Sequence, residues 1–176
     1  MPAVCDPGVC VLETERLVLR RLEFCDAPFL VELLNEPGWL RFIGDKGVRS
    51  TPDAELYIRT GPHAMYARHG FGLYLVERKA DRAPLGLCGL LKRDALECVD
   101  IGFAFRASAT GMGYASESAA AVREQARALG LRRLMAIATP DNAASHRVLR
   151  KLGMRFDMEI TMSGEAETLH LFVIDL

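Results

Sequence analysis

The sequence predicts an α/β (α+β) fold: one domain with a mixed, mostly antiparallel sheet of six to seven strands and helices on both faces. Three apolar, strand-like runs at residues 71–79, 85–92 and 98–105 follow one another with only short turn-rich breaks, which is typical of an antiparallel meander. The pattern then changes to helix, strand, helix, strand, strand. With 176 residues and 50% hydrophobic content, the chain can bury one substantial core but not two.

The first part of the chain alternates a strand with helices. A strand is predicted over residues 17–22 and a helix over residues 28–35. Residues 36–47 contain a Glu-Pro-Gly break and show no clear period, so we expect mainly loop there. Ser50, followed by threonine and proline, can cap a helix that continues, with one Gly-Pro interruption, towards His69.

The second part carries the clearest helical period. Small apolar residues recur at steps of four and three over residues 115–129, which predicts a helix that lies close on the sheet. Residues 134–138 are apolar throughout, as expected of a strand covered on both faces. Asp141 or Asn142 can cap a second helix that stops at Gly153. Two late strands, over residues 155–161 and 168–174, complete the predicted sheet.

Composition excludes several classes of protein. We assign residues 1–176 to one domain, with residues 1–11 as an irregular N-terminal extension; this start lacks a basic region and contains two prolines, so a cytoplasmic location is expected. The 22 basic and 23 acidic residues balance, which argues against a nucleic-acid or membrane partner. The five cysteines are odd in number and lack CxxC spacing, which argues against a disulfide framework and a metal site.

The most informative segment joins a strand to the helix over residues 115–129. It contains Gly111-Met112-Gly113, and glycines allow unusual torsions while the free N–H groups of the next helical turn face the loop. Those amides and the helix dipole predict an anion site suited to a diphosphate. A nucleotide P-loop would need Gly-Lys-Ser/Thr, and a dinucleotide fingerprint would need a third glycine; the segment has neither.

Four motifs, in order, resemble the GNAT N-acetyltransferase superfamily and, within it, the branch of ribosomal-protein N-terminal acetyltransferases. The resemblance spans the chain from about residue 12 to its end. It rests on Thr14-Glu15-Arg16-Leu17-Val18-Leu19-Arg20, Asp100-Ile101-Gly102-Phe103, Gly111-Met112-Gly113-Tyr114-Ala115-Ser116-Glu117-Ser118, and Pro140-Asp141-Asn142-Ala143-Ala144-Ser145 followed by Lys151-Leu152-Gly153-Met154.

This resemblance implies a GNAT-like domain with a splayed sheet, and acetyl-CoA as co-substrate without a metal. The strand that contains Phe103 and Phe105 would bind the pantetheine arm through its backbone, and Asn142 and Ser145 would contact the cofactor near its thioester. The pyrophosphate would be held by backbone amides of Gly111, Met112, Gly113, Tyr114 and Ala115. The implied reaction moves an acetyl group to a primary amine by direct attack in a ternary complex.

Direct attack requires a neutral amine, and a carboxylate can serve as the base. Asp100 stands where relatives most often have Glu and is the preferred base, acting through water; Glu97, three residues earlier, should face the other side of the strand. Many relatives carry a Tyr at the position of Arg150, where its hydroxyl is the general acid for the leaving thiolate. The guanidinium of Arg150 cannot take that role, because it does not give up a proton near neutral pH. The hydroxyl of Ser145 could supply part of that role, and a thiol with a pKa near ~8.5 leaves with little help.

Structural explanations stay open beside these roles. Asp100 could be a solvated or capping acid at a strand edge, and the role of Asn142 and Ser145 could be limited to capping the helix. Trp39 is either a core residue or part of the acceptor pocket. Thr110 and Ser108 also depart from residues common in relatives, Trp and Gln or Arg.

Function likewise keeps alternatives. The chain could be a catalytically silent acyl-CoA-binding regulatory module, or a transferase that uses another acyl-CoA donor. The acceptor could be a small-molecule amine or a protein N-terminus, because the fold does not fix the substrate. The resemblance also allows a homodimer.

Overall fold

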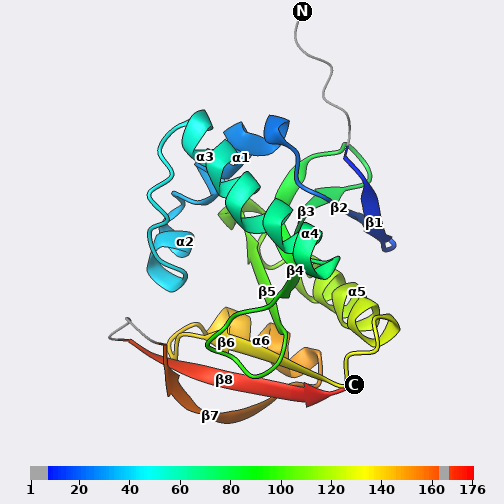
Figure 1. The fold of residues 1–176 in the computed structure, drawn as a ribbon, viewed down its shortest axis with the longest axis vertical. Helices are drawn as coiled ribbons and strands as arrows, with labels where there is room; N and C mark the ends of the chain where they lie inside the picture. Colours follow the sequence, from blue (N-terminus) through cyan, green and yellow to red (C-terminus); the bar gives the residue numbers. More distant parts are fainter. Residues whose placement is uncertain (1–7, 163–166) are drawn as a thin grey trace, which may run out of the picture.

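The computed structural model describes residues 8–162 and 167–176, which form one sheet covered by helices (Figure 1). The sheet has eight strands in the order β1-β2-β3-β4-β5-β6-β8-β7. The strands are β1 (Cys10–Glu13), β2 (Leu17–Arg20), β3 (Leu73–Arg78), β4 (Pro84–Leu91), β5 (Asp100–Phe105), β6 (Arg133–Ala138), β7 (Arg155–Thr161) and β8 (Thr168–Asp175).

The predicted class is confirmed, but the predicted count of six to seven strands is one too low. The additional strand is β1, and it enters the segment 1–11 that was expected to be irregular. It has four residues, pairs antiparallel with β2 alone and shifts register between Cys10 and Leu12. A strand so short is held by its neighbour rather than by its own apolar pattern, so the sequence carries little signal for it.

Strands β2 to β5 pair antiparallel in chain order, and within this series β3 to β5 form the predicted meander. The last of them begins at Asp100, two residues later than expected, because residues 92–99 form a loop. Along β5, side chains alternate between the two faces. Ile101 belongs to the core on one face, while Ala104 packs against the core on the other.

Strands β5 and β6 are parallel neighbours joined at one position only. The pair is Asp100 with Met135, and the N–H of Met135 donates to the carbonyl of Val99 at 3.0 Å. Beyond this point the strands diverge, and Figure 1 shows β6, β8 and β7 turned away from β1–β5. The sheet is therefore splayed between β5 and β6, and the opening lies at the carboxyl ends of both strands.

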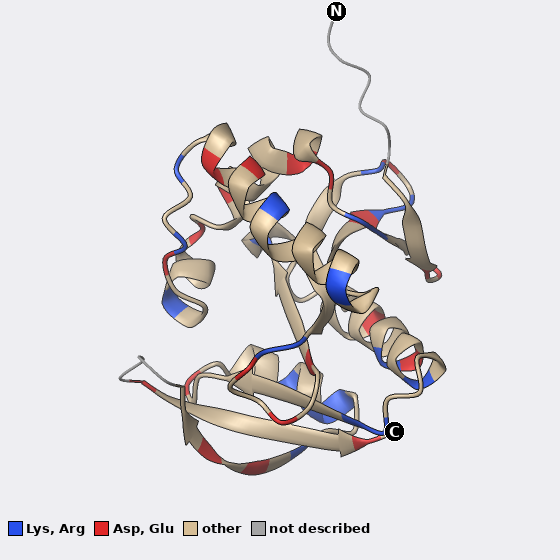
Figure 2. Ribbon diagram, viewed as in Figure 1, with Lys and Arg blue, Asp and Glu red and all other residues tan. Residues whose placement is uncertain are grey.

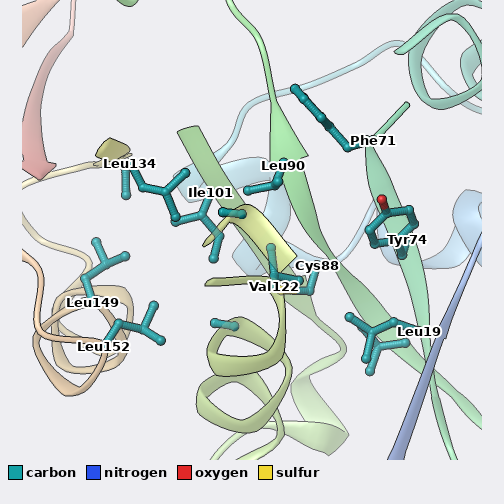
Figure 3. Close-up of a cluster of buried hydrophobic side chains, with 14 of the residues drawn as sticks. Leu19, Phe71, Tyr74, Cys88, Leu90, Ile101, Val122, Leu134, Leu149 and Leu152 are labelled. Carbon is teal, nitrogen blue, oxygen red and sulfur yellow. The ribbon is translucent and has the colours of Figure 1, made fainter. Parts of the chain in front are cut away.

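Helices cover both faces of the sheet. One face is packed by α5 (Tyr114–Ala128) and α6 (Ala143–Lys151), through a core that includes Cys88, Val122 and Leu149 (Figure 3). The other face is packed by α1 (Ala27–Leu33), α2 (Pro37–Phe42) and α3 (Thr51–Ile58). A π-helical segment, Arg59–His63, joins α3 to α4 (Ala64–His69) at the predicted Gly-Pro interruption.

The helix α2 occupies the segment that was expected to be loop. Pro37 stands at its first positions, where the fixed φ of proline suits a helix start and the missing N–H is not needed. Trp39 is the buried residue of this helix and packs in the core with α1 and α3. Because a helix of six residues is not stable alone, burial of Trp39 determines its formation, and the sequence pattern did not show it.

The cysteines differ from expectation at one position. Cys25 takes part in a disulfide, which the cysteine spacing did not predict. Cys10, Cys88 and Cys98 carry free thiols. Within the described residues, no helix combines the length and apolar character needed to cross a bilayer.

Candidate active site

Two adjoining cavities open where the sheet splays. The larger, of about 750 Å³, contains Asp100 in its wall and is called here the Asp100 cavity. The smaller, of about 560 Å³, lies against the Gly111–Gly113 loop and is called the loop cavity. Both are lined by Trp39, Phe42, Ile43, Phe103, Ala104, Ile137, Ala138 and Ser145. The shared lining means that molecules in the two cavities would meet at β5, β6, α2 and the start of α6.

The loop cavity has the features of a phosphate site. Gly111 and Gly113 adopt left-handed φ values of 76° and 84°, and the 15-residue helix α5 begins directly after Gly113. The wall also includes Arg147 and Lys151 from α6, where Figure 2 shows a group of basic residues. The predicted residues that line this cavity are Phe103, Phe105, Gly111, Gly113, Tyr114, Ala115, Asn142 and Ser145.

Arg16 fixes the conformation of this loop from the N-terminal motif. Its Nη1 donates to the carbonyl of Met112 at 3.0 Å, and its Nε donates to Glu117 at 2.7 Å. The guanidinium also lies 4.6 Å from the ring centroid of Tyr114. Thr14 adds a hydrogen bond of 2.6 Å to Glu117. The motif around residue 16 therefore contacts and holds the loop motif, although about a hundred residues separate the two along the chain.

Met112 is the predicted loop residue that the structure does not bring into the cavity wall. Its side chain is exposed, with a relative exposed area of 49% for the residue, and its carbonyl is occupied by Arg16. The resemblance implies a role for its backbone amide, not its side chain, in holding the pyrophosphate, and that role stays a prediction.

The Asp100 cavity contains an ion pair in which the carboxylate is buried and the arginine is partly exposed. Arg93 donates from Nε to both carboxylate oxygens of Asp100, at 3.2 and 3.1 Å, and the Asp100 side chain is only 1% exposed. Burial raises the pKa of Asp100 to about 6, and the Arg93 guanidinium opposes that rise. The carboxyl group is therefore mostly ionised at pH 7 yet able to accept a proton, and it is not the solvated strand-edge acid of the alternative explanation.

Of the two acids Glu97 and Asp100, only Asp100 faces the cavity, as expected, but the reason is not their spacing along a strand. Glu97 is exposed in the loop before β5, so it is not on the strand at all. Sequence reasoning missed Arg93 and Tyr57, which both line the Asp100 cavity. Burial raises the pKa of Tyr57 to about 12, so its phenol stays protonated at neutral pH. Neither residue belongs to a motif, and only the tertiary fold brings them to Asp100.

Asn142 and Ser145 show the predicted capping relationship. The side-chain oxygen of Asn142 accepts the N–H of Ser145 at 3.1 Å, which closes the first turn of α6. The same cap places Ser145 in the wall of both cavities and Asn142 in the wall of the loop cavity. The structural role therefore accompanies, and does not replace, a position at the site.

Arg150 is not at the site. It is exposed on α6 and lines neither cavity, whereas its neighbour Leu149 is buried and lines the Asp100 cavity. Adjacent helical residues point about 100° apart, so a shift of one residue changes the face completely. At this point α6 contributes the apolar side chain of Leu149 to the Asp100 cavity. The predicted comparison of Arg150 with the Tyr acid of relatives therefore does not apply to the cavity wall.

The part of the chain that the structure describes contains no group of side chains suited to hold a metal ion. Among residues 8–162 and 167–176, no three His, Cys, Asp or Glu side chains are grouped to hold an ion. His146 and His170 stack with ring centroids 5.3 Å apart. The Nε2 of His146 lies 3.0 Å from the carbonyl of Thr139, so this nitrogen already has a protein partner.

Comparison with known proteins decides the family. The acetyltransferase (GNAT) domain model matches residues 16–155. The chain belongs to the GNAT acetyltransferases. The GNAT match covers the Arg16 anchor, Asp100, the glycine loop and all of α6. The chain is therefore an acetyltransferase, and the matched range contains the whole lining of the loop cavity and the lining of the Asp100 cavity apart from Glu167 and Leu169.

The chain is also similar to individual bacterial proteins and to solved acetyltransferase structures. YnaD, an uncharacterized N-acetyltransferase of Bacillus subtilis, is 27% identical over 145 residues, 82% of each chain. YkkB, an uncharacterized protein of the same organism, is 30% identical over 156 residues, 85% of this chain and 87% of that one. The ribosomal L7/L12 alpha-N-protein acetyltransferase RimL, solved with coenzyme A, has a TM-score of 0.81 at 19% identity, over 96% and 98% of the two chains.

Proposed function

We propose that this GNAT domain transfers an acetyl group from acetyl-CoA to a primary amine by direct attack within a ternary complex. The observation that carries the proposal is the junction of the two cavities at Phe103 and Ser145. A donor in the loop cavity and an amine in the Asp100 cavity would meet there, and a buried carboxylate with a pKa of about 6 lies in the second cavity.

The loop cavity fits coenzyme A. The amides that begin α5, with Arg147 and Lys151 beside them, suit a diphosphate, and the splay between β5 and β6 leaves room for an extended arm. Gly111, Gly113, Tyr114 and Ala115 would hold the phosphates, and Phe103, Phe105, Asn142 and Ser145 would line the path of the arm. When bound, the donor supplies an acyl thioester, whose thiol is a good leaving group.

Asp100 would accept the proton of the attacking amine, directly or through a water molecule. An α-amino group, with a pKa near ~7.7 to 8, is about a tenth neutral at pH 7, whereas a lysine amine at ~10.4 is almost fully protonated. A base with a pKa of about 6 is ionised above that pH and can take the proton. Ser145, in the wall of both cavities, could donate a hydroxyl hydrogen bond to the departing thiolate.

A small-molecule amine and a protein N-terminus are both acceptors within the proposal. The likeness to RimL, an alpha-N-protein acetyltransferase by name, favours trying peptide N-termini first. In the cytoplasmic setting proposed for the chain, either kind of amine would be available.

The test measures release of free thiol from acetyl-CoA with a panel of peptides, amino acids and polyamines, beside calorimetric binding of coenzyme A. Coenzyme A binding together with amine-dependent thiol release supports the proposal. Binding without turnover on any amine would instead make the chain an acyl-CoA-binding module. Faster turnover with succinyl-CoA than with acetyl-CoA would overturn the choice of donor.

A further inference from the structure

Lys46 lies in the wall of the cavity where we place the acceptor amine. The residue belongs to the connection between α2 and α3 (Figure 1), is exposed, and lines the Asp100 cavity together with Asp100 itself. A lysine side chain ends in a primary amine on a flexible four-carbon stem. The acceptor cavity therefore has a primary amine of the protein in its own wall.

The connection that carries Lys46 packs on the face of the sheet to which Asp100 belongs. Val48, two residues after Lys46, is buried in the core that α1 and α3 form with the sheet, in one cluster with Leu87. Ala104 packs against the same cluster, and residues four apart on a strand share a face, so Asp100 lies on this face of β5. Lys46 and Asp100 therefore approach the cavity from the same side of the sheet.

The amine of Lys46 forms no ion pair or hydrogen bond with residues 8–162 and 167–176. The acid beside it, Asp45, is bound by Arg49 at 2.5 Å and accepts the N–H of Gly47 at 2.8 Å. Gly44 and Gly47 have φ values of 96° and 69°, and an added Cβ at either would meet nothing within 4 Å. The Lys46 side chain is therefore free to turn into the cavity without breaking a contact.

The other lysines are placed differently. The chain has four lysines, all in the part that the structure describes, and Lys46 alone lines the Asp100 cavity. Lys79 is held in an ion pair at 3.0 Å, and the Nζ of Lys92 donates to two backbone carbonyls. Lys151 lines the loop cavity, where the proposed phosphates would lie. Position and free amine thus coincide with the acceptor cavity only at Lys46.

We propose that Lys46 is a self-acetylation site, to which the protein transfers an acetyl group within its own cavity when no other acceptor is bound. The inference rests on the proposed function and adds an internal acceptor to it. Asp100 would take one proton from the Lys46 ammonium, and the neutral Nζ would attack the thioester carbonyl. A C–N bond forms and the C–S bond breaks. The departing thiolate takes the second amine proton and leaves as the free thiol, and Asp100 returns its proton to solvent.

Two features separate this step from the slow chemical acetylation of any exposed lysine. A lysine amine is almost fully protonated at neutral pH, so the enzymatic step should depend on the base, Asp100. Lys46 and an external amine would also compete for the same cavity, so a bound acceptor should protect Lys46. Acetylation would remove a positive charge from the cavity wall and fill part of the cavity.

The experiment incubates the wild-type protein with acetyl-CoA and no added amine, and follows each lysine by peptide mass spectrometry. We expect Lys46 to be acetylated about a hundredfold faster than in Asp100→Asn, the lower end of the usual contribution of a general base. Lys79 and Lys92 are internal controls and should react slowly and equally in both proteins. The rate at Lys46 should stay the same on dilution of the protein, and an amine that the enzyme turns over should lower it. Thermal unfolding verifies that Asp100→Asn is folded.

Three outcomes would overturn the inference. They are equal rates at Lys46 in the wild-type protein and Asp100→Asn, a rate no faster than at Lys79 and Lys92, or a rate that falls on dilution, which would show that one copy modifies another. Acetyl transfer to external amines while Lys46 stays unmodified would refute this inference and leave the proposed function in place. Absence of coenzyme A binding is the separate result that refutes the proposed function.

Discussion

Arg93 and Asp100 form an ion pair that joins the loop before β5 to the first residue of that strand, with Nε 3.1 and 3.2 Å from the two carboxylate oxygens. Asp100 is buried and stands at the single position where β5 and β6 meet. The pair therefore places a partly neutralised carboxylate at the closed end of the splayed sheet. Four predictions test this arrangement and the glycine loop opposite it.

Asp100→Asn should lower kcat by about 10²- to 10⁴-fold, the usual contribution of a general base. The fold should not lose stability at pH 7. Because burial raises the pKa of Asp100 from 3.8 to about 6, the native state binds the proton more tightly than the unfolded state, so stability falls as pH rises from about 4 to 6. A neutral amide avoids that loss, and thermal unfolding should show an equal or higher Tm. Glu97→Gln, at an exposed acid three residues away, is the control and should change neither quantity.

Arg93→Gln should move the acidic limb of the pH–rate profile upward. In the wild-type protein we expect kcat/KM to rise with pH through about 6, as Asp100 ionises. The guanidinium favours the ionised carboxylate, so its removal should raise that midpoint further. Arg155→Gln, at an exposed arginine on β7, should leave the midpoint in place. A midpoint that stays near 6 in Arg93→Gln would contradict the role of the pair.

Gly113→Ala should weaken coenzyme A binding at least tenfold by calorimetry. The residue has φ of 84°, which costs an L-residue roughly 1–2 kcal/mol, and an added Cβ would lie 3.3 Å from Nη2 of Arg16. Gly130→Ala is a matched control, because Gly130 has φ of 77° but lines neither cavity. It should lower Tm by a similar amount and leave binding unchanged. Equal loss of affinity in both variants would show that the loop has no special role.

Arg16→Gln should raise the Kd of coenzyme A about fivefold to tenfold, although Arg16 lines neither cavity. The reason is loss of its hydrogen bonds to Met112 and Glu117, each worth about 1 kcal/mol, which leaves the loop less ordered before binding. Arg127→Gln removes another arginine–glutamate pair, to Glu124 on α5, and should have no such effect. Unchanged affinity in Arg16→Gln would assign the motif around residue 16 to stability alone.

The sequence predicted those helices, strands and caps that are determined by residues close together in the chain. The helix α5 has a strong period and a glycine on each side, so the sequence predicted its position, and the anion site at its start stays a prediction. The meander β3–β5 was readable because its three strands are apolar runs and no helical pattern separates them. Residue type and spacing likewise limited the cap of α6 to Asp141 or Asn142, and the structure shows that it is Asn142.

The remainder depends on contacts between distant residues. The six-residue helix α2 forms because Trp39 is buried, and the four-residue β1 forms because β2 is beside it. The contrast between Leu149 and Arg150 depends on the rotation of α6 about its axis, which a motif cannot define to within one residue. Arg93 reaches Asp100 only after the loop before β5 has folded back.

The single contact between β5 and β6 gives the molecule two sheet edges in its interior. An extended chain with regularly spaced amides could bridge those edges as an additional strand would, since each edge presents backbone donors and acceptors. Binding there would unite the β1–β5 half and the β6–β8–β7 half into one mechanical unit. Coenzyme A bound there, as we propose, would therefore also crosslink the two halves of the sheet, and its release would leave them joined by the single β5–β6 pair.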